Sequence, residues 1–231
     1  FRLQKVSIVS NTPKVEKQAN LAIRMIASLL SDAQLVSVYL ALRMQKLEWL
    51  EPLDDKEKQQ SAWINLYVDA PLASRIGIFW IKSELEDRAF QILQPEQYAD
   101  LKRLVARKRD QRRMLVDKTL QEIQKMLQEA GLKHQVQGRY KRFYSIFEKL
   151  KRVDDDFEKI HDLTGFRVLV EHVRDCFTAL SYIHERWIPL DDRYKDYISQ
   201  PKPNGYQSLH TTVLNDEGEP LEIQIRTHEM H

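Results

Sequence analysis

The sequence predicts an α+β protein in which an all-helical region precedes a mixed β-sheet flanked by helices. Two observations favour this class. Up to Ala130 the apolar residues recur at helical spacing, and beyond Gly131 short β-branched runs alternate with helical patterns. All seven histidines and five of the six glycines also lie at position 131 or beyond. Strands that alternate with helices in one segment indicate a sheet covered by helices.

The helices of the first region are predicted from their apolar spacing and their end signals. Asn11-Thr12-Pro13 is a start signal for the first helix, and Gly131 is the glycine expected just beyond the last one. The predicted helices cover residues 21–30, 35–50, 64–67 and onward, 81–93 and 95–130, the last of them long and very polar.

The strands of the second region are predicted from β-branched and apolar runs. Thr164 to Val170 indicates a buried strand, and the turn residues 215–218 indicate a hairpin between two further strands. In chain order, the expected elements are a short strand at 133–137, an amphipathic helix at 142–151, the strand at 164–170, a helix at 175–187, and strands at 211–214 and 221–227.

The composition excludes several classes of protein. Hydrophobic residues make up 42% and charged residues 30% of the 231, the balance of a soluble globular protein, and the net charge of +2 gives no whole-chain signal for nucleic acid or membrane binding. No apolar run reaches the roughly 18 residues of a membrane helix. The single Cys176 leaves no disulfide partner, suits a cytoplasmic location and is expected to be a small buried hydrophobe. Because the chain begins at Phe1 and ends inside a helix-like pattern, we expect a piece of a longer protein.

The last predicted strand has the most informative polar pattern. Alternation along residues 221–227 separates an apolar face from a polar one. The polar face carries a carboxylate, an amide and a guanidinium in a row, from Glu222, Gln224 and Arg226. The alternative is that this row is only the solvated outer face of an antiparallel sheet.

A second carboxylate, Asp162, precedes the predicted strand at 164–170. Two carboxylates from neighbouring strands are what Mg²⁺ needs when it also binds phosphate oxygens and water. A helix-cap or turn role for Asp162 is the alternative.

Basic residues gather around the predicted helix at 139–151, which we expect to open at Gly138. Basic side chains at a glycine-opened helix N-terminus form an anion site, and a solvated basic stripe is the alternative. The residues concerned are Arg139, Lys141, Ser145 and Lys149.

Two further segments are dense in polar residues. In Pro201–His210 the prolines restrict the backbone, Asn204-Gly205 predicts a tight turn, and Tyr206 has a ring face available for stacking on a base. The alternative is a plain connector. The basic stretch from Lys102 to Arg113 on the long helix is interrupted by acidic residues, which predicts a solvated face, with RNA contact as the alternative.

Four of these segments, in this order, resemble motifs of the RelA/SpoT family of (p)ppGpp synthetases. The matching residues are Gly138-Arg139-Tyr140-Lys141 with Tyr144-Ser145-Ile146, Asp162-Leu163 through Arg167, Pro201 to His210, and Glu222 to Thr227. Four ordered motifs over about ninety residues form a specific match. Residues 70–77 and 81–87 also resemble the helical stretch that joins the family's two catalytic domains, so the resemblance covers nearly the whole chain.

The resemblance implies a nucleotidyltransferase-like domain that moves pyrophosphate from ATP to the 3′-hydroxyl of GTP or GDP, with Mg²⁺. It implies that Asp162 and Glu222 hold Mg²⁺, that Glu222 activates the 3′-hydroxyl, and that Arg139 is a third catalytic residue. It assigns ATP to Arg139, Lys141, Ser145 and Lys149, and the guanine nucleotide to Lys195, Lys202, Asn204, Tyr206, His210, Gln224 and Arg226, the last two also supporting Glu222. The basic motif Arg193-Tyr194-Lys195-Asp196 favours GTP as acceptor, and a ribosome partner is expected only for an intact protein.

The family's amino-terminal domain is a Mn²⁺-dependent (p)ppGpp hydrolase, and its metal site does not match here. Leu42 stands where the family has Asp, and Lys46 stands where it has Asn. An aliphatic side chain cannot bind Mn²⁺ and an ammonium repels it, so we expect hydrolase activity to be absent. The expected domains are a helical hydrolase remnant at 1–60, a connecting region at 61–95 and a synthetase domain at 96–231, truncated at its carboxyl end. Glu148 departs from the basic residue that many members carry.

Two alternatives to an active synthetase remain. A catalytically silent guanine-nucleotide-binding module would bind GTP without forming AMP, and a helical RNA-binding protein would bind in a salt-sensitive manner. The presence of both Asp162 and Glu222 argues against the silent module, because binding alone does not need Glu222.

Overall fold

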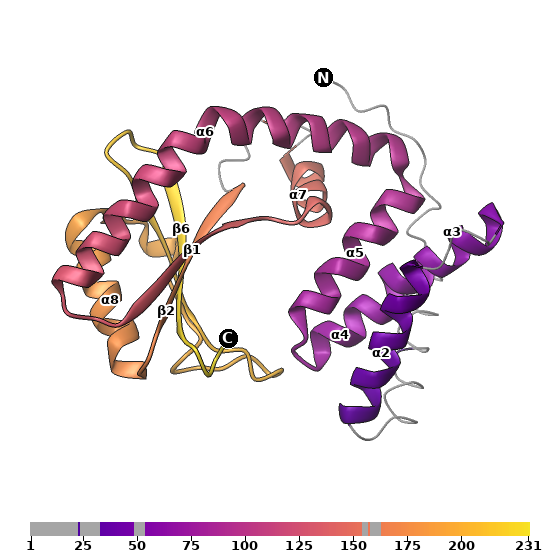
Figure 1. Ribbon diagram of the computed structural model, residues 1–231, viewed down its shortest axis with the longest axis horizontal. Helices are drawn as coiled ribbons and strands as arrows, with labels where there is room; N and C mark the ends of the chain where they lie inside the picture. Colours follow the sequence, from indigo (N-terminus) through magenta and orange to yellow (C-terminus); the bar gives the residue numbers. More distant parts are fainter. Residues whose placement is uncertain (1–22, 24–32, 49–53, 154–156, 158–162) are drawn as a thin grey trace. The chain divides into compact units, whose positions relative to one another are not determined.

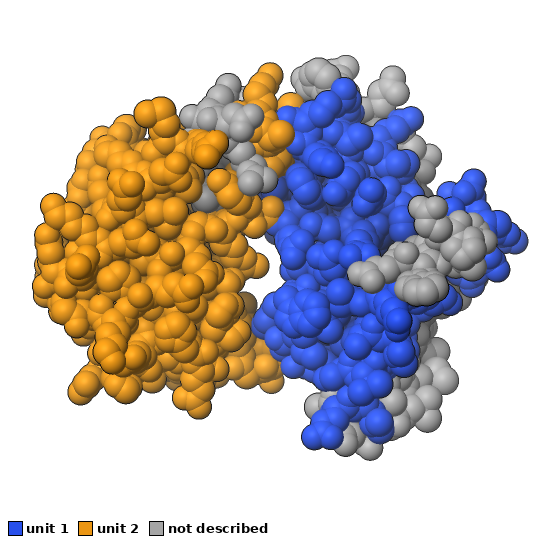
Figure 2. All heavy atoms as spheres, viewed as in Figure 1, with its two compact units in different colours: residues 1–103, 142–155 blue, residues 104–141, 156–231 orange. Residues whose placement is uncertain are grey.

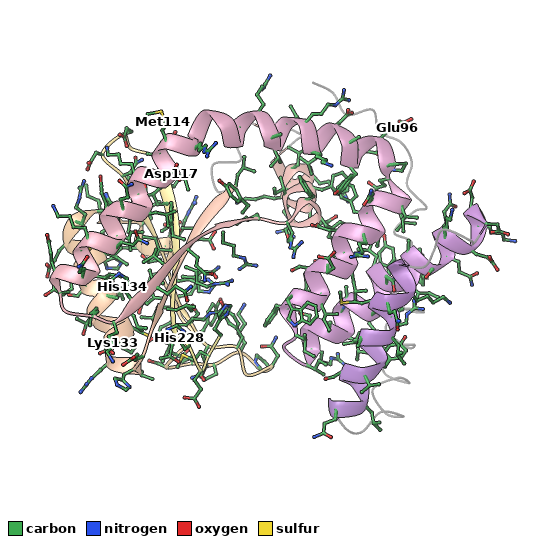
Figure 3. All side chains as sticks on the ribbon, viewed as in Figure 1. Glu96, Met114, Asp117, Lys133, His134 and His228 are labelled. Carbon is green, nitrogen blue, oxygen red and sulfur yellow. The ribbon has the colours of Figure 1, made fainter. Side chains whose placement is uncertain are left out.

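The computed structural model describes residues 23, 33–48, 54–153, 157 and 163–231 (Figure 1). The chain divides into two compact units, residues 1–103 with 142–155 (unit 1) and residues 104–141 with 156–231 (unit 2) (Figure 2). The described part of unit 1 is helical and unit 2 contains the sheet, so the predicted α+β class is confirmed. No helix in the described ranges combines the length and apolar character that a membrane crossing requires.

The helices of unit 1 follow the predicted pattern with one shift. The predicted helix at 21–30 lies outside the described residues, apart from Ile23. The third helix begins earlier than expected, because the Asp54 carboxylate accepts the Glu57 backbone N–H at 2.8 Å and caps it. The elements are α2 (Ala33–Glu48), α3 (Asp55–Ile64), the short π-helix η1 (Asn65–Asp69), α4 (Ala70–Arg75), α5 (Phe79–Leu93) and α7 (Phe143–Leu150).

The core of unit 1 forms where α2, η1, α4 and α5 bury their apolar stripes against one another, with Leu40, Leu72 and Leu85 essentially inaccessible. Helix α7 packs on α5 although contacting residues such as Asp87 and Tyr144 lie 57 positions apart in sequence. The Phe90 and Phe147 rings stack with centroids 4.4 Å apart, and the Asp87 carboxylate accepts the Tyr144 backbone N–H at 2.8 Å. These contacts place α7 in unit 1.

The long helix α6 (Pro95–Glu129) ends as the sequence predicts. Gly131 adopts φ +70°, a left-handed conformation that only glycine adopts readily, and the Leu132 backbone N–H donates to the Leu127 carbonyl at 3.0 Å. This arrangement satisfies the last turn of the helix and directs the chain into the first strand.

Unit 2 is built on one mixed sheet of six strands in the order β1-β2-β6-β5-β3, with β4 also paired to β5. Strands β2 and β6 run parallel and all other pairs are antiparallel. The elements are β1 (His134–Tyr140), β2 (Thr164–Val170), α8 (Val173–Arg186), β3 (Ile188–Pro189), β4 (Lys195–Asp196), β5 (Leu209–Leu214) and β6 (Pro220–Thr227). The two-residue strands β3 and β4 were not predicted.

One face of the sheet forms the core of unit 2. Alternate residues of the central strands, among them Phe166, Val168, Ile223 and Ile225, pack with apolar residues of α6 and α8. Cys176 on α8 is fully buried in this core, and burial raises the pKa of its thiol to about 11, as expected for a small hydrophobe. The other set of alternate residues therefore points to the opposite face.

The expectation of a helix that opens at Gly138 is wrong. Strand β1 continues through Gly138 and Arg139 to Tyr140, and α7 begins only at Phe143. Gly138 pairs with Phe166, and a Cβ there would lie 3.6 Å from Leu120 and Val116 of α6. A Cβ at this distance would make ordinary van der Waals contact with α6, so it is the pairing of β1 with β2 that places Gly138 in a strand.

Candidate functional site

The polar face of the sheet collects side chains from five strands into two adjacent rows. Residues paired across strands point to the same face, so the pairing defines the neighbours. One row runs across β1, β2, β6 and β5 through Arg139, Gly165, Glu222 and Thr212. The other runs from β1 to β4 through Gln137, Arg167, Gln224, His210 and Lys195.

The carboxylate of Glu222 lies in the centre of this face. Its Oε2 atom lies 2.8 Å from the ammonium nitrogen of Lys141, and the two side chains are 23% and 29% exposed. The Gln224 side chain donates to the other oxygen, Oε1, at 3.4 Å, and accepts from Arg139 on its own Oε1 atom at 3.4 Å. Arg139, Lys141, Gln224 and Glu222 therefore form one connected polar group.

The neighbours of Glu222 leave space above it. Gly165 has no side chain, and a Cβ there would lie 3.4 Å from the Glu222 carbonyl oxygen. Thr212, on the other side of Glu222, is short. A ligand can therefore approach Glu222 from the polar face without displacing a large side chain at either paired neighbour, Gly165 or Thr212.

Arg226 continues the polar face beyond Gln224. Its guanidinium contacts His231 Nδ1 at 2.6 Å and the Met230 carbonyl at 3.5 Å, and lies 5.9 Å from the centre of the Tyr206 ring. Arg167, on the neighbouring strand, contacts the Nε2 atom of the same histidine at 3.3 Å. Burial, together with the charges of Arg226 and Arg139, lowers the pKa of Arg167 to about 10.

The loop before β5 brings Tyr206 to the same face. Gly205 at φ +76° completes the predicted tight turn, and the Lys202 N–H donates to the Tyr206 carbonyl at 3.1 Å. The Asn204 side chain accepts the Tyr206 backbone N–H at 3.3 Å, so Asn204 positions the ring. Lys202 places its ammonium 5.3 Å from the ring centre.

His210 lies next to the Tyr206 ring and, unlike the cations around it, carries no charge at neutral pH. Its Nε2 atom and the Tyr206 hydroxyl are 2.7 Å apart. Burial, opposed by Glu222 and reinforced by Lys202, Arg226 and Arg139, lowers the pKa of His210 to about 4. At neutral pH the side chain is therefore an uncharged hydrogen-bonding group rather than a cation.

Three predicted site residues are not part of this description. Asp162 lies outside the described residues. Ser145 and Lys149 lie on α7 in unit 1, where Ser145 is exposed and Lys149 half-buried, whereas Arg139 and Lys141 belong to unit 2. The structure therefore brings together ten of the thirteen predicted residues in unit 2, namely Arg139, Lys141, Lys195, Lys202, Asn204, Tyr206, His210, Glu222, Gln224 and Arg226.

Sequence reasoning missed three neighbours of the site. Arg167 falls in a strand that was interpreted as buried, yet it pairs with Gln224 and so lies on the polar face. His231 lies between two guanidinium groups. Tyr197 follows a strand of two residues, too short to give a sequence pattern, and its ring lies among Tyr206, His210 and Lys202.

The electrostatics of the polar face favour an anionic ligand with several charges. The described cations are Arg139, Lys141, Arg167, Lys195, Lys202 and Arg226, and Glu222 is the carboxylate that lies among them. Clustered cations on a concave or open face raise the local concentration of polyanions. Aromatic rings beside cations suit a planar base attached to phosphates.

The helix that was compared with the hydrolase metal site has no ligand set at the two expected positions. Leu42 is 60% exposed, and Lys46 is exposed on the next turn of α2. Between them Arg43 points inward, where its Nε lies 2.6 Å from the Asp69 carboxylate. The same carboxylate accepts the Tyr39 hydroxyl at 2.8 Å, and Arg43 also donates to Asn65 Oδ1 at 3.0 Å.

The basic stretch on α6 is only partly a solvated face. Lys102, Arg103, Arg107 and Arg113 are exposed as predicted. Lys108 is instead buried, donating to the Phe157 carbonyl at 3.4 Å and lying 5.2 Å from the centre of its ring. Lys108 thus contacts Phe157 through both its backbone carbonyl and its ring.

The amino-acid sequence of this chain is similar to those of several known proteins. Residues 138–231 match the model of the region found in RelA / SpoT proteins. The chain is 39% identical to the GTP pyrophosphokinase of Myxococcus xanthus over 230 residues, which are 100% of this chain and 30% of the relative. It is 40% identical to the bifunctional (p)ppGpp synthase/hydrolase RelA of Mycobacterium tuberculosis over 208 residues, 90% of this chain and 28% of the relative. The chain thus spans less than a third of the length of these relatives.

A further relative and one solved structure complete the comparison. The GTP pyrophosphokinase of Streptomyces coelicolor is 42% identical over 214 residues, 93% of this chain and 25% of the relative. The small alarmone synthetase 1 from Bacillus subtilis, solved with its product pppGpp, is 26% identical with a TM-score of 0.44, covering 54% of this chain and 73% of that one.

Proposed function

We propose that this chain, whose residues 138–231 match the model of the region found in RelA / SpoT proteins, transfers the pyrophosphate of ATP to the 3′-hydroxyl of GTP or GDP. The observation that carries the proposal is the carboxylate of Glu222, which is paired with Lys141 at 2.8 Å on a face of guanidinium and ammonium groups. A carboxylate that can accept a proton, placed among cations, suits a reaction between two polyphosphates. The relatives named GTP pyrophosphokinase, similar over most of this chain, support the same reaction.

In this reaction the 3′-oxygen of the acceptor attacks the β-phosphorus of ATP. The bond from that phosphorus to the oxygen shared with the α-phosphate breaks, AMP leaves with that oxygen, and the proton of the 3′-hydroxyl passes to Glu222. The protein contributes by holding both nucleotides in line and by neutralising the charge that develops on the transferred group.

In this scheme the Lys141 ammonium can pair either with Glu222 or with the phosphates of ATP. Without nucleotide its ammonium is paired with Glu222. Phosphate oxygens of ATP would offer it a second anionic partner, and its transfer to them would leave Glu222 able to accept a proton. Arg139, which already contacts Gln224, would neutralise charge on the same side. Ser145 and Lys149 of α7 complete the ATP assignment as proposals from the sequence.

Mg²⁺ fits the chemistry of this donor set. The ion usually binds proteins through one or two carboxylates and completes its shell with water and substrate phosphates. Glu222 is accessible on the polar face, and Asp162 precedes the strand next to it in the sheet. These two carboxylates would hold Mg²⁺, which when bound neutralises charge on the phosphoryl oxygens.

For the acceptor, we assign the guanine base to Tyr206, positioned by Asn204, and its phosphates to Lys195 and Lys202. His210 differs from the role that the resemblance implies, because it is neutral at pH 7. It would support the Tyr206 hydroxyl and donate or accept a hydrogen bond, rather than supply charge. Gln224 supports Glu222 directly, and Arg226 lies against the Tyr206 ring.

We propose further that unit 1 has no (p)ppGpp hydrolase activity, because Leu42 and Lys46 supply no Mn²⁺ ligand. The site chemistry suits the cytoplasm, where ATP and GTP are abundant. A ribosome partner, expected for longer relatives, is not assigned to the described residues. Release of pyrophosphate from ppGpp in the presence of Mn²⁺ would contradict the loss of hydrolase activity.

The test is formation of AMP and 3′-pyrophosphorylated guanosine nucleotide from ATP with GTP or GDP and Mg²⁺. Glu222→Gln removes the proton acceptor while keeping the shape, and we expect at least a roughly thousand-fold loss of kcat. Glu217→Gln, at an exposed carboxylate of the hairpin whose described partner is Lys118, is the matched control and should leave the rate unchanged. Binding of GTP without AMP formation by the unmodified chain would instead support the silent module.

A further inference from the structure

The residue Tyr197 is attached on both sides to the scaffold of unit 2. Its backbone N–H donates to the Ser208 carbonyl at 3.0 Å, which fixes it against the start of β5. The Asp196 carboxylate accepts the backbone N–H groups of Ile198 and Ser199 at 2.9 and 2.8 Å and closes a tight turn directly after it. The Gln207 side chain donates to the Ile198 carbonyl at 3.3 Å. Tyr197 thus has a defined position although it lies between a two-residue strand and a loop.

The ring of Tyr197 contacts the rings of Tyr206 and His210. Its centroid lies 6.0 Å from that of Tyr206 and 5.3 Å from that of His210, with interplanar angles of 66° and 89°. The Tyr206 and His210 rings are themselves 5.7 Å apart at 88°. Edge-to-face pairs of this kind are the favoured aromatic geometry, so the three rings hold one another in orientation.

Lys202 is bound more closely by Tyr197 than by Tyr206. Its ammonium nitrogen lies 4.5 Å from the centre of the Tyr197 ring and 5.3 Å from that of Tyr206. Lys202 is exposed, and within the described ranges it makes no ion pair with a carboxylate. The face of an aromatic ring is therefore what restricts this flexible cation, which remains available to an anion.

The surroundings indicate a role beyond packing. Tyr197 is half-buried and its ring partners lie at the edge of the polar face, whereas the apolar core of unit 2 uses the neighbouring Ile198. A tyrosine needed only for packing would point toward the apolar core of unit 2, as Ile198 does. Tyr197 instead points toward a cation and two rings that the sequence motifs assign to nucleotide binding.

We propose that Tyr197 is a positioning residue for the acceptor nucleotide, which orients the Tyr206 ring and holds Lys202 where the acceptor's phosphates bind. This inference rests on the proposed function. It assigns the ring of Tyr197, and not its hydroxyl, to the task, because the contacts to Lys202, Tyr206 and His210 all involve the ring. It also confines the effect to GTP or GDP and leaves ATP binding to the groups around Lys141.

The test compares Tyr197→Leu with Tyr197→Phe. Loss of one ring pair and one cation–π contact should raise KM for the acceptor about 5- to 50-fold in Tyr197→Leu, while KM for ATP and kcat at saturation change less than about twofold. Tyr197→Phe keeps the ring and should behave like the unmodified chain. Tyr182→Leu, a partly exposed tyrosine of α8 on the covered side of the sheet, is the matched control.

Coupling to Lys202 gives a second and independent measure. In a double-mutant cycle with Lys202→Met, the effects of Tyr197→Leu and Lys202→Met on acceptor KM should combine to less than their product, since both remove one contact. Fully multiplicative effects would overturn the proposal. So would equal losses for ATP and GTP, or an acceptor KM that Tyr197→Leu does not change. If Tyr197→Leu lowers the melting temperature, Tyr197→Met, which restores side-chain length, serves in its place.

The failure of this inference can be separated from failure of the proposed function. GTP affinity is also measured by calorimetry in the absence of ATP. If the unmodified chain forms no AMP but binds GTP, and Tyr197→Leu weakens that binding 5- to 50-fold, Tyr197 retains its assigned role and the pyrophosphokinase assignment fails. If AMP is formed and Tyr197→Leu changes neither affinity nor acceptor KM, the pyrophosphokinase assignment stands and the role of Tyr197 fails.

Discussion

The buried ion pair of unit 1 permits a quantitative prediction. Asp69 is fully buried, and Arg43, only 14% exposed at its side chain, lies 2.6 Å from it. Arg43→Met would leave the Asp69 carboxylate in the core of unit 1 without this counter-ion, although still hydrogen-bonded to Tyr39. We expect this change to be far more harmful than the simultaneous replacement Arg43→Met with Asp69→Leu, because the double variant buries no charge.

The magnitude follows from the partners that each variant removes. Breaking a buried pair by removing one member costs about 3 to 5 kcal/mol, and the slight exposure of Arg43 favours the lower part of that range. The side-chain oxygen of Asn65 (Oδ1) also loses its Arg43 donor, which adds about 1 kcal/mol to the cost. We therefore expect a loss of about 4 kcal/mol for Arg43→Met and a recovery of about 2 kcal/mol in the double variant.

The assay is urea unfolding followed by circular dichroism at 222 nm, with the transition of unit 1 identified as the one that the variants move. Burial raises the pKa of Asp69, and loss of Arg43 would raise it further. A folded-state pKa above the unfolded value near 3.8 means that the folded state binds the extra proton, so Arg43→Met should regain stability as pH falls from 7 toward 4. The reasoning would be refuted if the losses in unfolding free energy of Arg43→Met and Asp69→Leu simply added in the double variant. A loss below about 1 kcal/mol for Arg43→Met at pH 7 would also refute it.

Three further predictions concern unit 2. Gly165→Val would place a branched side chain between Arg139 and Glu222, so kcat/KM should fall about 100-fold while the melting temperature holds, with a smaller loss for Gly165→Ala. The folded-state pKa of His210 is about 4 against 6.5 unfolded, so the contribution of neutral His210 to stability is complete above pH 6.5 and is lost as pH falls. Between pH 7 and pH 5 the free energy of unfolding of the unmodified chain should therefore drop about 1 to 2 kcal/mol more than that of His210→Gln. An equal drop in both would contradict a neutral histidine. Gly131→Ala should cost about 1 to 2 kcal/mol in urea unfolding, since alanine is strained at φ +70°; an unchanged midpoint would show that the chain can exit α6 differently.

Much of the fold was predictable because its signals are local. The end of α6 at Gly131 and the hairpin before β6 depend on backbone preferences of a few adjacent residues. The alternation along β6 placed Glu222, Gln224 and Arg226 on one face, as the pairing with β2 and β5 confirms. The order of strands is also consistent with the expected neighbours, since β2 and β6 are adjacent and parallel.

The remaining features depend on contacts between distant segments. Gly138 looks like a helix start until its pairing with Phe166 of β2 is known. Strands β3 and β4 exist only because β5 pairs with them, so two residues carry no periodic pattern. The charge state of His210 results from burial and from cations that belong to three different strands and loops, which no local pattern encodes. The roles of Asp162, Ser145 and Lys149 stay predictions.

The strand that carries Glu222 is the last of the described strands in sequence and yet occupies the interior of the sheet, between β2 and β5. A chain that has reached only β5 can form the antiparallel β1–β2 pair and, separately, β5, but it has no strand to join them. Formation of unit 2 therefore depends on contacts of large sequence separation, such as that between Gly165 and Glu222, and is expected to be slow compared with the helices of unit 1. The same insertion that joins the two parts of the sheet also brings Glu222 to the polar face beside Lys141.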